Sequence, residues 1–440
     1  MDALTNYHRN CNHLIVQFAA AKACGAPIGL RKSTSNLFRQ RNRPPPAKLD
    51  VRRFHRVLSI DGEHLFADVE GMTTYEHFVR DTLTHGLLPA VVPQLKTITV
   101  GGAVSGLGIE SSSFKFGLVH EGVEEMDILV GAGQIVRCSR TENADLFYGF
   151  PNSYGTLGYA LRLRMKLIRA SPYVRLSHTG FTHADTYFSS IAGVCEDGEA
   201  DFLDGTVFSE NEMYATEAHF AGHAPHLSDY TYRNIYYRSI QRKTEDWMTT
   251  QDYIWRWDTD WFWCSKHFYL QNPVVRLIAT KWLLNSRTYH QIMRLSQRVI
   301  PDVSGRESVI QDIDIPLDRA AEFLDFLLHE IGITPVWICP FRSSGQAARF
   351  DLYSLHPNTS YINFGVWDTV VSKGGEGYLN RKIEVKAAAL GGKKALYSRA
   401  YYDQETFWRI FNKARYDQLK KKYDAGGVFK DLYAKCVRGE

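Results

Sequence analysis

A glycine-rich segment from Thr97 to Ser113 is the feature that most constrains how this chain can fold. Four glycines fall within eight residues there, at Gly101, Gly102, Gly106 and Gly108. Because glycine has no Cβ, such a backbone can approach a phosphate or a flat ring closely. The segment has no Gly-Lys-Ser/Thr run, and no third glycine follows at the spacing of a doubly wound dinucleotide fold. The sequence therefore favours another nucleotide fold, with a ligand-free glycine turn as the alternative.

Hydrophobic periodicity predicts an α+β chain, in which strands and helices follow one another without regular alternation. In the first part we expect helices over 8–24 and 74–85, and strands over 57–60, 65–69, 126–130, 134–138 and 159–168. Pro172 marks the exit from this part. Beyond it we expect a β-α-β unit of a second, α/β domain, with a strand over 308–317, a helix over 318–330 and a strand over 334–339.

Composition bounds the kind of ligand and partner. The 440 residues allow two domains or a domain with a cap, and 13% aromatic residues suit a large core or the walls of a flat or apolar ligand site. Net charge is only +4, but the last 70 residues hold 16 Lys/Arg against 8 Asp/Glu. This basic tail is either a solvated helix face or a contact with an anionic cofactor or membrane headgroups. It accompanies no nucleic-acid-binding motif, so we expect no nucleic-acid partner.

Cysteine usage and hydropathy bear on location. The seven cysteines are scattered without pairs or His/Cys clusters at metal-binding spacing, which indicates reduced thiols and no metal site. No run reaches the roughly 18 apolar residues of a membrane span. We expect a cytoplasmic protein, with peripheral contact to a membrane as an open alternative.

The glycine-rich segment and its continuation resemble the FAD-binding region of the vanillyl-alcohol oxidase, or PCMH-type, superfamily. A Thr-x-Gly-Gly run precedes the flavin loop, and four later motifs keep the superfamily's order, at 114–118, 133–138, 143–147 and 153–158. The closer resemblance is to the delta-24 sterol reductase (24-dehydrocholesterol reductase) family. It is carried by GIESSS from Gly108 and by later landmarks at 309–312, 335–341, 396–397 and 405–408, and it covers most of residues 30–436.

The resemblance implies which residues hold FAD. The segment from Thr99 onward would line it, through Thr99, Val100, Gly101, Gly102, Ala103, Val104, Ser105, Gly106, Leu107, Gly108, Ile109, Glu110 and Ser111. The turn over 32–36 lies where the superfamily's first pyrophosphate loop belongs, with Ser33, Thr34, Ser35 and Asn36 as the phosphate-binding residues. Gly155 and Gly158 would support the flavin. That first loop has no His or Cys at the position of covalent attachment, so we expect non-covalent FAD.

The resemblance also implies the domain order. A two-subdomain PCMH-type FAD-binding domain would span 1–171, and an α/β substrate (cap) domain would span 172–380. A C-terminal helical segment over 381–440 would return to the flavin and contact the FAD domain.

The activity implied is NADPH-dependent reduction of a carbon–carbon double bond in a lipid, either a sterol side chain or a methylene fatty acyl chain. An isolated alkene accepts hydride when an acid protonates it, so such a site needs a proton donor, an apolar channel and exclusion of water. The candidates are Glu110 in the flavin loop, Tyr397 and Tyr401 in the C-terminal segment, and His120, whose intrinsic pKa suits the task. Each could instead be a packed or hydrogen-bonded structural residue.

Four tryptophans lie within nine residues between Trp255 and Trp263. This run is core packing, an aromatic wall for a long apolar substrate, or an interfacial belt that touches a membrane. Asp258 and Asp260 inside it could act as acids if desolvation raised their pKa.

Two other functions stay open. One is an FAD-dependent alcohol or sugar oxidase or dehydrogenase, and the other is a non-catalytic flavin- or lipid-binding scaffold. Animal sterol reductases carry an N-terminal membrane anchor that we do not find in this sequence, which keeps the fatty acyl substrate beside the sterol.

Overall fold

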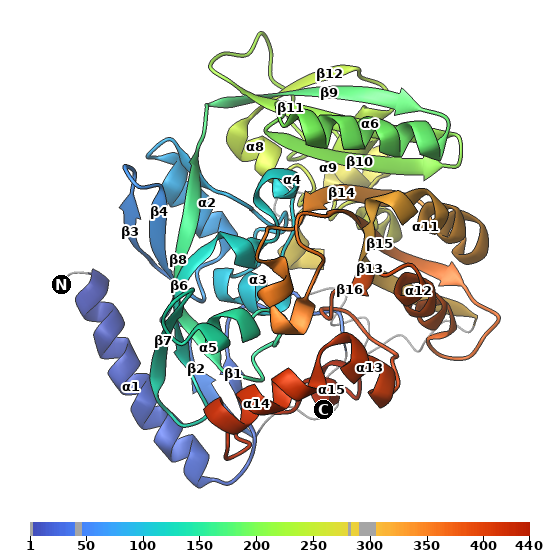
Figure 1. The fold of residues 1–440 in the computed structure, drawn as a ribbon. Coiled ribbons are helices and arrows are strands. Elements are labelled where there is room, and N and C mark those ends of the chain that lie inside the picture. The colour runs from blue at the N-terminus through green and yellow to red at the C-terminus, as the bar shows by residue number, and fades with distance from the viewer. Residues whose placement is uncertain (1–2, 40–45, 280–282, 290–304) are drawn as a thin grey trace.

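A computed structural model describes residues 3–39, 46–279, 283–289 and 305–440. Two units built on sheets lie side by side, and the C-terminal helices cross from one to the other along the lower side of Figure 1. The mixed α+β class predicted from periodicity is confirmed.

The N-terminal unit contains a small parallel sheet, β1 with β2, and a six-stranded antiparallel sheet of order β3-β4-β8-β6-β7, with β5 paired to β8. Its elements are α1 (Ala3–Ala23), β1 (Ile28–Arg31), β2 (Ala47–Asp50), β3 (Val57–Asp61), β4 (Phe66–Glu70), α2 (Tyr75–Leu83), β5 (Leu87–Pro89), α3 (Val100–Gly106), α4 (Ser113–Phe116), β6 (Val123–Leu129), β7 (Ile135–Ser139), α5 (Ala144–Gly149) and β8 (Tyr159–Arg169). The helices and strands expected in this part are all present.

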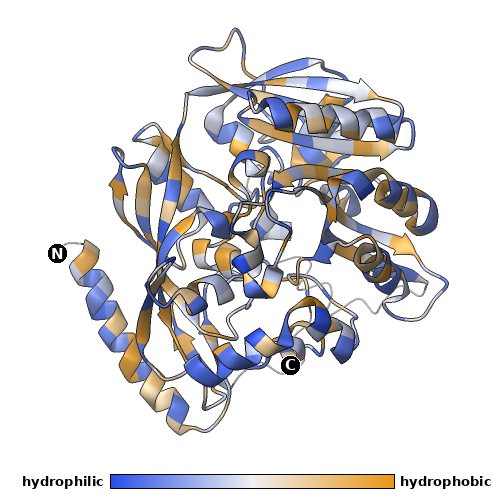
Figure 2. Cartoon of the chain, in the orientation of Figure 1, coloured by the Kyte–Doolittle hydropathy of each residue, from blue (hydrophilic) through white to orange (hydrophobic). Residues whose placement is uncertain are grey.

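Helix α1 forms because its apolar residues recur at helical spacing. It buries Tyr7, Leu14 and Phe18 along one face, which packs on β1 and β2. The other face is mixed, with polar residues beside the exposed Leu4, Ile15 and Val16. Figure 2 shows the resulting alternation of hydrophobic and hydrophilic residues along α1.

The second unit is one eight-stranded sheet of order β12-β9-β11-β10-β14-β15-β13-β16. Its elements are β9 (Tyr173–Phe181), α6 (Ala184–Asp197), β10 (Phe202–Ser209), β11 (Glu212–Ala221), α7 (Tyr236–Ile240), β12 (Glu245–Thr249), α8 (Thr250–Ile254), α9 (Pro273–Ile278), β13 (Arg306–Pro316), α11 (Ala320–Phe326), β14 (Val336–Arg342), β15 (Ser360–Val371), α12 (Tyr378–Ala389) and β16 (Lys393–Lys394).

The expectation of an α/β cap is wrong, because every strand pair in this sheet is antiparallel. The strand-helix-strand run predicted over 308–339 is present, but β15 lies between β13 and β14. The unit is therefore a split β-α-β arrangement, in which β15 separates the two strands that the helix connects. Because β15 follows both strands in the sequence, local periodicity could not place it between them.

Helices and cavity lie on opposite faces of this sheet. Helices α6, α11 and α12 pack on one face against Ile313, Ile338 and Phe364. Side chains alternate along a strand, so the neighbouring positions of β13, β14 and β15 point the other way, toward the N-terminal unit. The candidate site is built on this second face.

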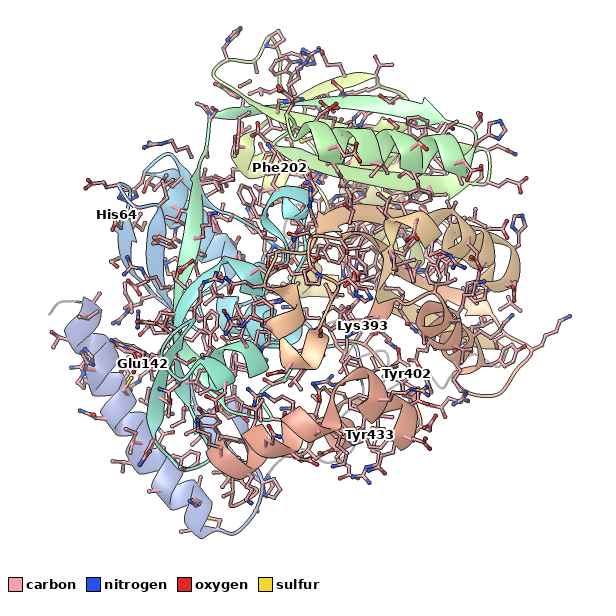
Figure 3. All side chains as sticks on the ribbon, viewed as in Figure 1. His64, Glu142, Phe202, Lys393, Tyr402 and Tyr433 are labelled. Carbon is pink, nitrogen blue, oxygen red and sulfur yellow. The ribbon has the colours of Figure 1, made fainter. Side chains whose placement is uncertain are left out.

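The C-terminal segment joins both units through α13 (Gln404–Ile410), α14 (Lys413–Tyr423) and α15 (Leu432–Cys436). Lys422 forms an ion pair with Asp145 of α5 at 2.7 Å. The outer side of α14 is mostly hydrophilic in Figure 2. Within the segment, the Tyr433 hydroxyl donates to the Tyr402 carbonyl at 3.2 Å, and Figure 3 labels both residues.

Two boundaries can be compared with the sequence expectation. The first sheet ends at Arg169 and the second begins at Tyr173, on either side of the expected 171/172 boundary. The expected boundary at 380 falls inside α12, which packs on the cap sheet, and β16 adds a strand to that sheet. The cap unit therefore continues to Lys394. No helix among the described residues is both long enough and apolar enough to cross a bilayer.

Candidate active site

A cavity of about 350 Å³ lies between the N-terminal unit and the cap sheet. The N-terminal unit contributes the turn after β1, the glycine-rich segment and the loop around Tyr154, and the cap contributes the inner face of β13, β14 and β15. The residues expected to bind FAD that line it are Thr34, Ser35, Asn36, Thr99, Gly101, Gly102, Ala103, Ser105, Gly106, Leu107, Gly108, Ile109, Gly155 and Gly158.

The glycine-rich segment is a short helix, α3, and not the loop that we expected. Thr99 caps it by accepting from Gly102 N at 3.3 Å. The glycines are needed for close packing: a Cβ on Gly101 would lie 2.8 Å from the Gly71 carbonyl oxygen, and one on Gly106 would lie 3.1 Å from the Tyr154 ring. The segment therefore packs closely on Gly71 and Tyr154, and its backbone from Gly101 to Gly108 forms part of the cavity wall.

Some expected FAD residues do not line the cavity. Val100 and Val104 are fully buried on the core side of α3, because helical spacing turns them away. Ser33 lies outside the lining, and Ser111 is buried against Glu110 and Tyr253. We correct the assignment of these residues, and of Glu110, as cavity-lining groups.

The turn at 34–36 is fixed beside the glycine-rich segment by two hydrogen bonds. Thr34 Oγ1 donates to the Thr97 carbonyl at 3.0 Å, and Thr97 Oγ1 donates to Asn36 Oδ1 at 3.0 Å. This juxtaposition agrees with the expected pyrophosphate loop, since hydroxyl and amide groups from two separate stretches face one cavity.

Arg39 supplies a positive charge that the sequence analysis did not single out. Its side chain is 7% exposed and lines the cavity, and its guanidinium lies 4.8 Å from the centre of the Tyr154 ring. Nη1 donates to the Leu396 carbonyl, whereas Nη2 is buried and has no hydrogen-bond partner among the described residues. A buried guanidinium N–H without a partner fits an anionic ligand group such as a pyrophosphate. Lys32, Lys48, Lys430 and Lys435 also line the cavity.

An aromatic wall covers the cap side. Trp261, Phe262, Trp337 and Trp367 line the cavity, and the rings of Phe262 and Trp367 stack with centroids 3.9 Å apart. Trp261 and Phe262 adopt positive φ angles of 45° and 60°, which bulky residues rarely adopt. The tryptophan run is thus mostly core, as Trp257 and Trp263 show, while its central part forms the wall expected for a flat or apolar ligand.

Two carboxyl groups lie in this wall. Asp312 and Asp314 are two residues apart on β13, so both face the cavity. Asp314 accepts hydrogen bonds from the Tyr353 hydroxyl and from Asn363 Nδ2, both at 2.7 Å. Asp312 Oδ1 is buried without a hydrogen-bond partner among the described residues.

The environment of Asp312 keeps its carboxyl protonated. Burial and the charge of Asp314 raise its pKa to about 8, although a hydrogen bond from Tyr397 opposes the rise. Burial also raises the pKa of Asp314 to about 6. Neither carboxyl forms an ion pair with a cation in the part of the chain that the structure describes. Asp312 is therefore a neutral acid near pH 7 and can donate a proton.

Of the four acid candidates from the sequence, only Tyr397 lines the cavity. Glu110 is buried between Ser111 and Arg256. His120 is buried against Phe350, and burial lowers its pKa to about 3. Tyr401 is half-buried at the cap surface, where its amide donates to Glu384. These three are structural residues here because each packs away from the cavity.

Asp258 and Asp260 are also structural. Asp258 accepts from Lys96 N at 3.0 Å and from Ser286 Oγ at 2.6 Å, and Asp260 forms an ion pair with Arg276 at 2.7 Å. Asp312 was visible in the sequence only as a family landmark. The signal that could have found it is two acids at alternate positions between isoleucines at the end of a predicted strand, which places both on one face.

Comparisons with known proteins agree with this geometry. Residues 10–139 match a family model described as an FAD binding domain. The Delta(24)-sterol reductase of Arabidopsis thaliana is 28% identical over 439 residues, covering 89% of this chain and 77% of the relative. The Homo sapiens Delta(24)-sterol reductase is 25% identical over 400 residues, covering 87% and 76%. Cytokinin dehydrogenase 7 of Oryza sativa subsp. japonica is 28% identical over 201 residues, covering 44% and 38%.

The cavity residues fit FAD as well. A glycine-rich wall, a polar turn and a buried guanidinium suit a pyrophosphate, and the aromatic wall suits a flat ring system. The chain is an FAD-dependent oxidoreductase with a PCMH-type FAD-binding domain, homologous over most of its length to the Delta(24)-sterol reductases.

Proposed function

We propose that this protein reduces a carbon–carbon double bond in a lipid, either a sterol side chain or a methylene fatty acyl chain, with NADPH as the electron donor. The observation that carries the proposal is Asp312, whose carboxyl has one buried oxygen and a raised pKa and faces an aromatic cavity on the side of the cap. The names of the relatives support the reaction, since they are Delta(24)-sterol reductases.

The reaction adds a proton and a hydride to the two carbons of the alkene. FAD held by the glycine-rich segment, the turn at 34–36 and Arg39 would supply the hydride chemistry, with NADPH as the source of the electrons. Asp312 supplies the proton to the other carbon, which breaks the Asp312 O–H bond and the alkene π bond and forms one C–H bond. Asp312 then takes up a proton from solvent, so the net reductant is one NADPH and one proton.

The residues around Asp312 hold it for this task. Trp367 Nε1 donates to the Tyr397 hydroxyl at 3.0 Å, and Tyr397 lies close enough to Asp312 to oppose the rise in its pKa. Trp367 and Tyr397 therefore form the cavity wall beside the carboxyl. The ring faces of Phe262, Trp337 and Trp367 exclude water and can stabilise positive charge that develops on the protonated alkene.

The same carboxyl argues against the oxidase alternative. An alcohol oxidase needs a base near the flavin, and a group with a pKa of about 8 is mostly protonated at neutral pH. Asp312 is therefore better suited to donate a proton than to accept one.

The test is a pair of anaerobic stopped-flow experiments on the FAD-loaded protein. In the first, NADPH is mixed with oxidised protein, and bleaching of the flavin band within seconds is expected. In the second, the reduced protein is mixed with a sterol that carries a side-chain alkene or with a methylene-bearing phospholipid, and return of the band with formation of the saturated product is expected. A flavin that alcohols reduce and NADPH does not would overturn the proposal in favour of an oxidase.

A further inference from the structure

Helix α9 exposes its apolar side chains and buries its charged one. Val274, Leu277 and Ile278 are exposed, with Ile278 78% exposed, whereas Arg276 is only 4% exposed. This is the reverse of a surface helix in a globular protein, whose apolar residues face the core.

Specific polar contacts hold α9 in this orientation. Arg276 forms a buried ion pair with Asp260, with Nη1 and Nη2 at 2.7 and 2.9 Å from the two carboxylate oxygens. Arg276 also donates to the carbonyls of Tyr232 and Asn234, and the Tyr232 hydroxyl donates to the Leu277 carbonyl at 3.0 Å. These polar contacts fix the apolar side of α9 toward the surface. The helix cannot rotate inward without breaking the buried ion pair between Arg276 and Asp260.

Residues on both sides of α9 extend the exposed apolar surface. We call it the apolar patch, and its residues are Tyr269, Val274, Val275, Leu277, Ile278 and Leu283. Six exposed large apolar residues within fifteen positions form the densest such group in the described chain, since the others are spread over 4–16, 227 and 371–385. A group of exposed large apolar residues this dense marks an interaction site.

The charge of the surrounding chain selects the partner. Between residues 261 and 301 the sequence contains six Lys/Arg and no Asp or Glu. Two of these cations flank the apolar patch, Lys266 and Arg287, with side chains 34% and 65% exposed and with Asp368 and Glu76 as ion-pair partners. Arg276 is buried with Asp260, so Lys266 and Arg287 are the surface cations of this stretch among the described residues. An apolar surface in a stretch of sequence that contains no acidic residue matches a bilayer that contains anionic lipids.

An aromatic column connects the patch to the cavity. Phe38 and Trp261 line the cavity and stack with centroids 5.3 Å apart. Trp261 stacks on Tyr289 at 6.2 Å, and Tyr289 stacks on Phe268 at 5.6 Å, next to Tyr269 of the patch. The cavity wall and the patch are therefore parts of one continuous piece of structure.

We propose that the apolar patch inserts into the surface of an anionic bilayer and so brings the cavity wall to the membrane. Membrane binding by the apolar patch does not depend on the reaction. The consequence for the substrate rests on the proposed function, because a lipid would then pass between the bilayer and the cavity without crossing water.

The test is flotation of the FAD-loaded full chain with vesicles of phosphatidylcholine alone and of phosphatidylcholine with 30% phosphatidylserine. The test variant is Leu277→Ser/Ile278→Ser. The matched control is Val371→Ser/Val385→Ser, which removes equally exposed apolar residues from the cap surface (63% and 70% exposed). We expect binding to the anionic vesicles that falls roughly tenfold or more in the test variant and is unchanged in the control.

Equal binding by the wild type and both variants would overturn the proposal. So would a wild type that ignores vesicles while the patch mediates concentration-dependent self-association in sedimentation. Flavin bleaching by NADPH, measured without vesicles, should be the same in all three proteins. A failure of the proposed reaction would appear in that assay, and a failure of membrane docking would appear in flotation alone.

Discussion

Two pairs of carboxyl groups in the interior differ in whether a cation lies beside them, and this difference separates a structural pair from a candidate proton donor. Glu110 and Asp204 lie at the junction of the two units with Arg256 between them, 3.3 and 2.7 Å from their carboxylate oxygens. Asp312 and Asp314 lie on the cavity wall and pair with no cation among the described residues. Glu110, Asp204 and Asp314 are at most 4% exposed, whereas Asp312 is partly exposed toward the cavity.

The cation makes the first pair structural. Burial raises the pKa of Glu110 to about 7, although Arg256 opposes the rise, and the ion pair ties the carboxylate to the interior. The indole N–H groups of Trp257 and Trp337 donate to Asp204 at 3.3 and 3.1 Å. At the second pair, burial acts on Asp312 without a balancing positive charge, so the proton stays on the carboxyl. A buried acid becomes a proton donor when it faces a cavity and lacks a cation.

The largest effect is expected from Asp312→Asn. The variant keeps shape and hydrogen bonding but cannot deliver a proton, so reoxidation of the reduced protein by the alkene should slow by about 10²–10⁴. Stopped-flow absorbance measures it, and the NADPH half-reaction serves as the internal control. Glu110→Gln is the matched variant at the other pair, and a comparable slowing there would break the distinction between the two sites.

Removing the cation should be the largest effect on stability. Arg256→Met leaves two buried carboxyl groups without their cation, and we expect a loss of about 3–5 kcal/mol in the free energy of unfolding. Denaturant titration measures it, and adding Glu110→Gln and Asp204→Asn to the same chain should restore most of the loss. Asp312→Asn should lower the free energy of unfolding by less than about 1 kcal/mol, because Asp312 has no ion-pair partner that the substitution would leave unpaired.

The next effect concerns the cofactor end of the cavity. Arg39→Met removes the buried guanidinium, and FAD affinity should fall about 10- to 100-fold because a charge-assisted hydrogen bond contributes about 1.5–3 kcal/mol. Titration of FAD into the apoprotein, followed by flavin fluorescence, measures the dissociation constant. Arg381→Met on the exposed surface of α12 is the control, and equal losses in both would contradict a specific role for Arg39.

The smallest effect is a pH dependence. Asp312 donates only while protonated, and its pKa is raised to about 8, so alkene-driven reoxidation should be flat below that pH and fall roughly tenfold per pH unit above it. In the Asp312→Asn variant the residual rate should lose this decline. A wild-type rate that instead rises through pH 8 would identify a base at the site and favour the oxidase alternative.

Local pattern predicted most elements of the fold. Helical spacing in α1 and strand alternation in β13 are properties of neighbouring residues, so the expected bounds are close to those observed. The order of the sheet was out of reach, because β15 enters between β13 and β14 from a distant part of the chain. The same holds for the site. The glycines at the cavity were expected from local sequence pattern, whereas Arg39 and Asp312 were not identified as functional residues because distant segments bring them to the cavity.

The sequence by itself determined the FAD-binding region, because close glycine spacing and motif order are written along the chain and tolerate few other structures. Only the tertiary structure decided which acid is a proton donor. The protonation of Asp312 depends on burial, on Asp314 and on Tyr397 from another segment. Glu110 is removed from the same role by its position, because it pairs with Arg256 and does not line the cavity. Likewise, α9 faces outward because Asp260 holds Arg276 inside. Electrostatic environment is set by groups that folding brings together, which local sequence does not encode.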